Sequence, residues 1–311
     1  MTKLPNKEFR QLVCLIREDK EFYEAEEIRP IHWPEYNAAQ IKEAKETLTF
    51  IRDKVDAAEL LSTKGKAGKP LTNSKSLAKA ILGCEALGLT ERNAQGWLEI
   101  LGPFLGIYEH LDDRTIGDAY DKVEVIYLLK QIFEKTKCSD GILSGDGTGL
   151  ETSRKQNYEL NKITGHYLTS IVDSREIVQS YDIYEHESKA MHKLIELVYG
   201  DSIRLDAGFN DRELTRKITQ KGIVPYIFPM KNNKLNGSVA WKSMYMDLFL
   251  DVMSWLTEYH MRSHSESFHS SFKTRYGIIT KRRLSSILSQ VTARIILHNR
   301  RRLAYFNRLT G

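Results

Sequence analysis

The sequence predicts an α/β protein, with a mixed five-stranded sheet and flanking helices preceded by an α-helical N-terminal domain. Two observations support this. Up to about residue 135 the apolar residues recur at helical spacing, whereas from Gly141 short strand-like runs alternate with helical patterns. In addition, 311 residues with 41% hydrophobic content can bury a large core in one or two domains.

Helices are expected throughout the N-terminal domain, which we place at residues 1–135. Its predicted helices cover residues 38–61, 76–87, 90–101 and 112–135. The second and third of these are joined by a turn at Gly88, and Thr90 is a suitable N-cap for the third. The pair is similar to a helix-turn-helix, although helical hairpins of this kind are usually only packing units.

The remaining residues, 136–311, are expected to form the sheet and its helices. The predicted strands cover residues 142–148, 166–173, 176–184, 202–206 and 224–229. The predicted helices cover residues 188–199, 211–222, 243–276 and 284–308. Three consecutive strands followed by alternating helices and strands match a ribonuclease H-like core. Fold alone does not determine function, so the functional prediction depends on individual side chains.

Four functional side chains recur at helical spacing in the predicted helix at 243–276. They are Tyr259, Arg262, Glu266 and Lys273. On an ideal helix, which turns about 100° per residue, all four fall within an arc of roughly 60°. Arg262 and Glu266 are also an ordinary i,i+4 pair of the kind found on solvated helix faces. A carboxylate flanked by two cations and a phenol nevertheless suits a metal ion held beside a phosphate.

Two further acids are candidate partners of Glu266. Asp146 lies in the first predicted strand, where flanking glycines leave room for ions, although Asp-Gly is also a common turn. Asp206 ends a predicted strand, where α/β sheets carry their chemistry. Asp201 and Asp211 are alternatives to it, the first preceding the strand and the second starting a helix, where an acid complements the helix dipole. Carboxylates of this kind suit Mg²⁺ or Mn²⁺.

These motifs resemble those of a known family. The order Tyr, two residues, Arg, three residues, Glu, six residues, Lys resembles the segment around the last acid of bacterial and archaeal insertion-sequence transposases of the Asp-Asp-Glu (DDE) type. Asp146, followed by Gly-Thr-Gly, is similar to the first acid of that family, and Asp206, followed by Ala-Gly-Phe, is similar to the second. The resemblance covers about residues 112–305. The large β-rich insertion of some relatives is absent, because only about residues 230–243 separate the last predicted strand from the Glu266 helix.

The resemblance implies a DNA transposase that cleaves transposon ends and transfers the cut strand into target DNA. Asp146, Asp206 and Glu266 would be its catalytic residues and would also bind the metal, two Mg²⁺ ions, with Mn²⁺ as a plausible substitute. The implied partners are double-stranded DNA, at terminal inverted repeats and at the target, and a second copy of the chain in a homodimeric synaptic complex. Residues 1–135 would then contribute to DNA binding or dimerisation.

The same resemblance implies particular DNA contacts. Tyr259, Arg262 and Lys273 would contact DNA near the cleaved end. Apart from the resemblance, Lys231, which follows the last predicted strand, is a candidate for contact with the DNA backbone.

Positive charge is concentrated near the C-terminus. Residues 261–311 carry 11 Lys or Arg and one acid, whereas the rest of the chain carries 35 basic and 40 acidic residues. Such an asymmetry favours a polyanion partner over a merely solvated helix face. We therefore expect three consecutive arginines of the last predicted helix to bind DNA. They are Arg300, Arg301 and Arg302.

Two other functions fit parts of this pattern. A catalytically inactive, DNA-binding transposon relic would keep the basic C-terminus, although all three acids are present. An actin-like or sugar-kinase-type ATPase shares the core fold, and Gly145–Gly149 is compatible with its phosphate loop. The Tyr-Arg-Glu-Lys pattern and the basic C-terminus are not expected in such an ATPase. Inverted repeats flanking the gene would favour the transposase, whereas tight ATP binding without DNA binding would favour the ATPase.

The expected location is the cytoplasm, in association with the nucleoid. Cys14, Cys84 and Cys138 are far apart and form no Cys-x-x-Cys pair, so we expect reduced thiols and no zinc site. The N-terminal segment lacks an apolar signal core, and no run approaches the roughly 18 apolar residues of a transmembrane helix.

Overall fold

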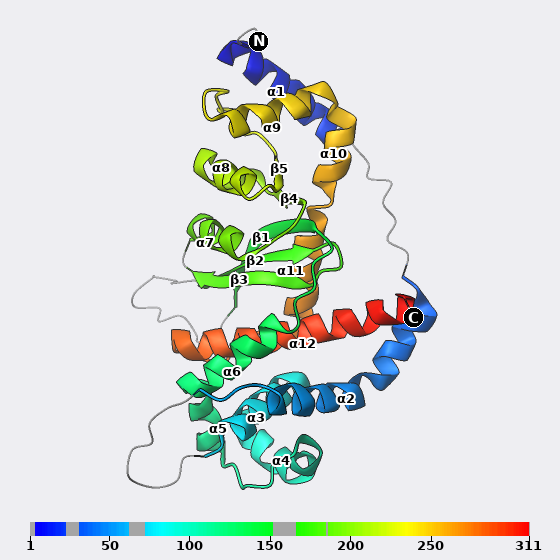
Figure 1. Ribbon diagram of the computed structural model, residues 1–311, viewed down its shortest axis with the longest axis vertical. Helices are drawn as coiled ribbons and strands as arrows, with labels where there is room; N and C mark the ends of the chain where they lie inside the picture. The colour runs from blue at the N-terminus through cyan, green and yellow to red at the C-terminus, as the bar shows by residue number, and fades with distance from the viewer. Residues whose placement is uncertain (1–3, 23–30, 62–71, 152–165, 185, 311) are drawn as a thin grey trace. The chain divides into compact units, whose positions relative to one another are not determined.

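The computed structural model describes residues 4–22, 31–61, 72–151, 166–184 and 186–310 (Figure 1). These residues form two compact units, each assembled from stretches that are far apart in the sequence. The sheet unit takes the described residues of 1–30, 138–150 and 164–271, and the helical unit takes those of 31–137, 151–163 and 272–311. The predicted domains, 1–135 and 136–311, are instead separated at one position in the sequence. The functional role expected of each domain stays a prediction.

The sheet has five strands in the order β3-β2-β1-β4-β5. They are β1 (Ile142–Leu150), β2 (His166–Asp173), β3 (Val178–Tyr184), β4 (Ser202–Leu205) and β5 (Val224–Ile227). β2 pairs antiparallel with β1 and β3, whereas β4 pairs parallel with β1 and β5. The predicted fold class, an α/β fold with a mixed five-stranded, ribonuclease H-like sheet and a helical N-terminal region, is therefore confirmed.

Helices pack on both sides of this sheet. In Figure 1, α7 and α8 lie on one side of the strands and α10 lies on the other. Completely buried side chains from several elements form one core, among them Phe9 of α1, Leu143 of β1 and Leu256 of α10. The helices of the sheet unit are α1 (Asn6–Phe22), α7 (Glu187–Leu194), α8 (Arg212–Gln220), α9 (Val239–Leu250), α10 (Val252–His260) and the first part of α11 (Ser263–Tyr276).

The prediction of one helix over 243–276 is wrong, because this stretch contains breaks that separate α9, α10 and α11. Asp251 ends α9 and caps α10 with its side chain. At the second break, N–H groups bond to carbonyls three residues back, as in the 3.0 Å bond from Arg262 N to Tyr259 O. A tighter turn of this kind rotates the chain more per residue than an α-helix. The arc calculated for one ideal helix therefore does not apply across Arg262.

The helical unit is built around α3, which is buried along most of its length. The predicted helix at 112–135 is two helices, α5 and α6. None of the helices in the described part of the chain has the length and apolarity that crossing a membrane requires. The helices of this unit are α2 (Trp33–Asp56), α3 (Ser74–Leu87), α4 (Glu91–Leu105), α5 (Asp113–Ala119), α6 (Val123–Glu134) and α12 (Leu284–Thr310).

One buried acid ties three parts of the helical unit together. Glu85 of α3 accepts hydrogen bonds from Tyr120 Oη at 2.8 Å and from Gln290 Nε2 at 2.9 Å. Its other oxygen pairs with Arg294 Nε of α12 at 2.7 Å. Both carboxylate oxygens of Glu85 are thus satisfied inside the fold.

Candidate active site

The parallel pairing of β1 with β4 brings two of the predicted acids side by side. Gly145 of β1 pairs with Leu205, the last residue of β4. The next residue of each chain segment is an acid, Asp146 and Asp206, and neighbouring strands lie about 4.8 Å apart. A Cβ at Gly145 would lie 2.7 Å from Leu205 Cδ2, so glycine allows this close packing. The site therefore begins where β4 ends.

Asp146 is largely buried among charged side chains. Its side chain is 22% exposed, and burial raises its pKa from the ordinary value of 3.8 to about 6. The N–H of Gly147, which donates to Asp146 Oδ1 at 2.8 Å, and the charge of Arg262 oppose this rise. The nearby carboxylates of Asp206 and Glu187 add to it. A perturbed carboxyl group among specific charged neighbours is typical of functional sites.

Glu187 is a fourth acid at this site. It begins α7, and its carboxyl group packs against Gly147, where an added Cβ would lie 2.4 Å from Glu187 Cδ. Burial and the charge of Asp206 raise the pKa of Glu187. Glu187 was not predicted, because no motif or spacing in the sequence distinguishes it from an acid that merely starts a helix.

Arg262, in the turn between α10 and α11, is the cation among these acids. Its guanidinium pairs with Glu266 at 2.7 Å. Burial lowers the pKa of Arg262, but negative neighbours outweigh this effect and leave the pKa raised. Those neighbours include Asp206 and Asp146 as well as Glu266. The structure thus brings Arg262 and all three predicted acids into one electrostatic cluster.

Tyr259 supports Arg262 from the core of the sheet unit. The ring of Tyr259 is 2% exposed, stacks on Trp255 with centroids 5.2 Å apart, and lies 6.0 Å from Arg262 Cζ. Burial raises the pKa of Tyr259 to about 12, so the phenol is neutral. Its direct contact with DNA stays a prediction.

His269 of α11 contacts the first acid and was not predicted. Its Nδ1 lies 3.9 Å from Asp146 Oδ2, and its Nε2 lies 2.9 Å from Ser170 Oγ on β2. Ser, His and Asp are the components of a hydrolase triad, but Ser170 is completely buried and cannot reach a substrate. We therefore interpret His269 as a residue that positions Asp146. Its place one turn after Glu266 is the only sequence signal that could have indicated it.

A cation of the N-terminal helix also faces the acids. Lys20 of α1 is partly buried, with Nζ 5.0 Å from the ring centroid of Tyr259. Burial and the charge of Arg262 lower the pKa of Lys20. The charges of Asp206 and Glu266 oppose this change, so the ammonium group is within electrostatic range of both acids. Sequence spacing could not indicate Lys20, because it is far from the acids along the chain.

Two of the predicted DNA contacts lie on exposed parts of the chain. Lys273 is exposed in the last turn of α11, and Lys231 is exposed between β5 and α9. The structure places neither of them in the electrostatic cluster of the three acids. Their roles stay predictions.

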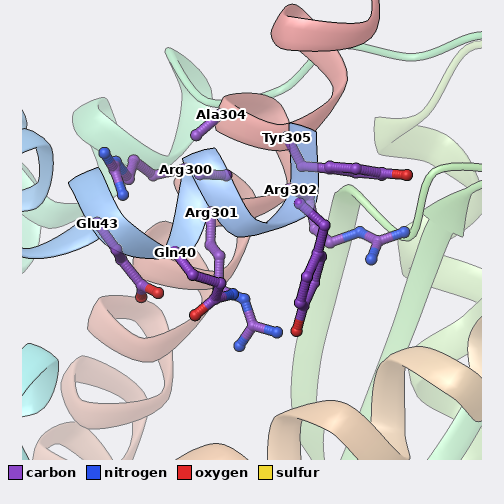
Figure 2. A pocket seen from close by; sticks show the side chains of 9 residues that line it. Gln40, Glu43, Arg300, Arg301, Arg302, Ala304 and Tyr305 are labelled. Atoms are coloured by element: carbon purple, nitrogen blue, oxygen red, sulfur yellow. The ribbon is translucent and has the colours of Figure 1, made fainter. Parts of the chain in front are cut away.

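The three arginines of α12 have different surroundings. Arg300 is 7% exposed, and it pairs with Glu46 of α2 at 2.9 Å. Arg301 and Arg302 are partly exposed, and Arg302 Cζ lies 5.2 Å from the ring of Phe306. The three side chains leave the helix in different directions, as a rotation of about 100° per residue requires (Figure 2). A DNA contact by Arg300 would require breaking its pair with Glu46, so Arg301 and Arg302 are the better candidates.

The acids match the ligands that Mg²⁺ and Mn²⁺ prefer. Carboxylate oxygens are hard donors, and a bound cation relieves the repulsion that raises the pKa of neighbouring acids. Asp146 and Asp206 fit this requirement because they are neighbours and because Asp206 raises the pKa of Asp146. Within the described residues, no three His, Cys, Asp or Glu side chains converge closely enough to hold an ion as they lie. The donor chemistry therefore fits a divalent metal, and a small rearrangement of side chains would be needed to bind it.

Comparison with known families identifies the class of protein. The chain belongs to the family defined by the transposase DDE domain, whose sequence pattern matches residues 137–300. The resemblance to insertion-sequence DDE transposases is thereby confirmed, and the match favours neither the inactive relic nor the ATPase. It does not test the Tyr-Arg-Glu-Lys motif or the role of any single residue. No curated protein and no solved structure matches the chain.

Proposed function

We propose that this protein is a transposase that hydrolyses a phosphodiester bond at the ends of an insertion sequence and joins the freed 3′-hydroxyl to target DNA. Asp146, Asp206 and Glu266 are its catalytic residues. The observation that carries the proposal is the register of β1 and β4, which puts Asp146 beside Asp206. Arg262, which pairs with Glu266, lies within electrostatic range of both aspartates. Membership of the transposase DDE domain family supports the same reaction.

The three acids would hold two divalent ions, Mg²⁺ or Mn²⁺. When bound, such ions activate the attacking oxygen and stabilise the leaving oxygen of an in-line displacement. Asp146 and Asp206 are suited to share an ion because they are adjacent. Glu187 is a further carboxylate within electrostatic range of both.

The cations of the site would position the DNA strand. Arg262 has a planar guanidinium that suits two-point contact with phosphate, and Lys20 adds a second cation from α1. Binding of a metal by Glu266 would weaken its ion pair with Arg262, which is made through Glu266 Oε1. An incoming phosphate would take the place of that carboxylate, so Arg262 would remain paired with an anion throughout. The ring of Tyr259, 6.0 Å from Arg262 Cζ, would help to position the guanidinium.

Double-stranded DNA is the proposed partner, at terminal inverted repeats and at the target. Lys231, Lys273, Arg301 and Arg302 would add backbone contacts outside the cluster of acids. Because two ends must be cut and joined, a homodimer in a synaptic complex is part of the proposal, with residues 1–135 contributing to DNA binding or dimerisation.

The proposal is tested by replacing each acid with alanine and measuring Mg²⁺-dependent nicking of DNA taken from both ends of the element. Asp146→Ala, Asp206→Ala and Glu266→Ala should each lower the nicking rate by on the order of 10²–10³-fold or more, because each removes charge stabilisation in the transition state. DNA affinity should change little, since phosphate contacts supply most of it.

Asp201→Asn is the matched control, because Asp201 lies close to Asp206 in sequence but precedes β4. It should nick at the wild-type rate. Near-normal nicking by any one of the three alanine variants would remove that residue from the catalytic set.

A further inference from the structure

The helical unit contains an open groove that the proposed active site does not use. It has a volume of about 990 Å³. One wall is formed by residues 41–57 of α2 and the turn after it, and the other by residues 300–308 of α12. Lys135 and Thr136, which follow α6, complete the lining. All of these residues belong to the same compact unit.

The two acids that line the groove already have cationic partners inside the unit. Glu46 pairs with Arg300 at 2.9 Å and with Arg308 at 2.5 Å. Asp53 pairs with Arg52 at 2.9 Å. These pairs neutralise the acidic side chains, so the acids are not available to balance the other cations of the groove.

The remaining cations of the groove have no acidic partner in the part of the chain that the structure describes. Lys42, Lys45 and Lys54 are exposed, and none of them forms a salt bridge with a described residue. Lys135 Nζ lies 3.4 Å from the carbonyl oxygen of Ala57, which carries no formal charge. The groove is therefore a concave surface with an uncompensated positive charge, which attracts anions more strongly than an isolated lysine does.

The lysines are arranged along the groove rather than around one point. Lys42 and Lys54 are separated by about 18 Å along α2, at 1.5 Å per residue. That length corresponds to the axial rise of about five base pairs of duplex DNA. Nine residues turn α2 by about 900°, so Lys45 and Lys54 lie on opposite edges of the face that lines the groove. A small anion could engage one or two of the lysines, whereas a duplex, which carries two rows of phosphates, can reach lysines on both edges.

We propose that the groove between α2 and α12 binds the phosphate backbone of duplex DNA. The lysines contact phosphates without reading base sequence, and Arg300 and Arg308 keep Glu46 neutralised beneath them. The proposal rests on the proposed function only in naming DNA as the polyanion. It assigns a DNA-binding site to the helical unit that is separate from the acids of the sheet unit.

The test is the salt dependence of DNA binding by the full-length chain, measured with a labelled duplex in the presence of a chelator. Lys42→Gln, Lys45→Gln and Lys54→Gln are combined in one variant, because glutamine keeps a similar helix propensity. The slope of log affinity against log salt should fall by about 0.9 for each phosphate that the variant no longer neutralises, or up to about 2.7 in all. Affinity should fall at least about 10-fold at low salt.

A control variant carries the same change of charge outside the groove, at Arg114→Gln, Lys122→Gln and Lys130→Gln in the same unit. It should keep nearly the wild-type slope. An unchanged slope in the groove variant, or an equal decrease in both variants, would overturn the proposal. A groove variant that no longer binds polyglutamate but still binds DNA normally would also overturn it, because the groove would then be a surface for acidic proteins.

This test is independent of the active-site test. DNA binding is measured without metal, so failure of the acids to support nicking leaves the result for the groove unaffected. Conversely, a groove variant that binds DNA normally would leave the acids and their role in nicking untouched. A thermal melt of each variant confirms that the fold is retained.

Discussion

Glu85 in the helical unit and Asp146 in the sheet unit are both largely buried carboxyl groups, yet their surroundings are opposite. Glu85 has Tyr120, Gln290 and Arg294 as donors, and both of its oxygens are paired. Three donors surround one acid there. A buried charge that is paired in this way holds the elements of the fold together.

Around Asp146 the acids outnumber the donors, because several carboxylates share a few cations. Burial is the main cause of the raised pKa of Asp146, and the charges of Asp206 and Glu187 add to it, while the nearby guanidinium, that of Arg262, is paired with Glu266. This arrangement costs stability unless another cation arrives. Glu85 thus has a structural role, whereas the carboxylates around Asp146 are in a state that favours binding of a cation.

The largest effect on stability is expected at Glu85. Glu85→Ala leaves the guanidinium of Arg294 buried without its carboxylate, and breaking a buried pair in this way costs about 3–5 kcal/mol. Chemical denaturation measures the change in the free energy of unfolding. Glu99→Ala, an exposed acid of the neighbouring helix α4, is the control and should stay within about 0.5 kcal/mol of wild type. A decrease below about 1 kcal/mol for Glu85→Ala would contradict a structural role for this carboxylate.

A smaller effect, on activity rather than stability, is expected at Arg262. Arg262→Lys keeps the positive charge among the acids, so the melting temperature should change little. The ammonium cannot reproduce a two-point grip on phosphate, so DNA nicking should fall by on the order of 10–100-fold. Arg216→Lys is the matched control, because Arg216 pairs with Glu213 on the surface of α8. Normal nicking by Arg262→Lys would mean that Arg262 serves only as a counter-charge.

The smallest effect is expected at Asp146, where a substitution should stabilise the metal-free protein rather than destabilise it. The folded pKa of about 6 exceeds the ordinary value of 3.8, so the folded state binds more protons between these values and stability falls as pH rises through them. Asp146→Asn should therefore stabilise the metal-free protein by about 1–3 kcal/mol at pH 8 and by much less below pH 4. Thermal melts in chelator across this range measure the difference.

Asp173 at the end of β2 provides the control for that measurement. Burial also raises its pKa to about 6, but Asp173 accepts hydrogen bonds from Ile177 N at 2.9 Å and from the side chain of Arg175. Asp173→Asn should nevertheless destabilise the fold at pH 8, because an amide group cannot accept hydrogen bonds at both positions and would place a donor opposite the guanidinium of Arg175. If Asp146→Asn also destabilises the fold, the charged carboxylate of Asp146 does not lower the stability of the metal-free protein, and the prediction is wrong.

Much of the fold follows from local patterns in the sequence. The five strands were predicted with errors of a few residues at their ends, because alternation and flanking glycines are local signals. The break at Arg262 was missed, since the residues on both sides of it have good helical spacing. The turn there depends on hydrogen bonds to carbonyls three residues back, which no helical periodicity indicates.

The residues of the candidate site also differ in whether a local sequence signal indicates them. Asp146, Asp206 and Glu266 were predicted because each lies in a short motif, and the register of β1 and β4 explains how the first two come to lie side by side. Their catalytic role stays a prediction. Glu187 and Lys20 have no motif. They reach the acids only through the packing of α7 and α1 in the sheet unit, which is a property of the whole fold.

The place of α1 in the sheet unit has a consequence for how the chain is made. α1 leaves the ribosome long before α9 and α10 are synthesised, yet its buried residues Phe9, Val13 and Ile16 share one core with Tyr245 and Tyr259 of those helices. Contacts between such distant segments require long loops to close and slow the folding of a chain. Throughout synthesis the apolar stripe of α1 must remain in water or on a chaperone. A nascent chain that stops before α10 therefore exposes that stripe and the uncovered side of the sheet, and it is expected to aggregate rather than to form a partly active enzyme.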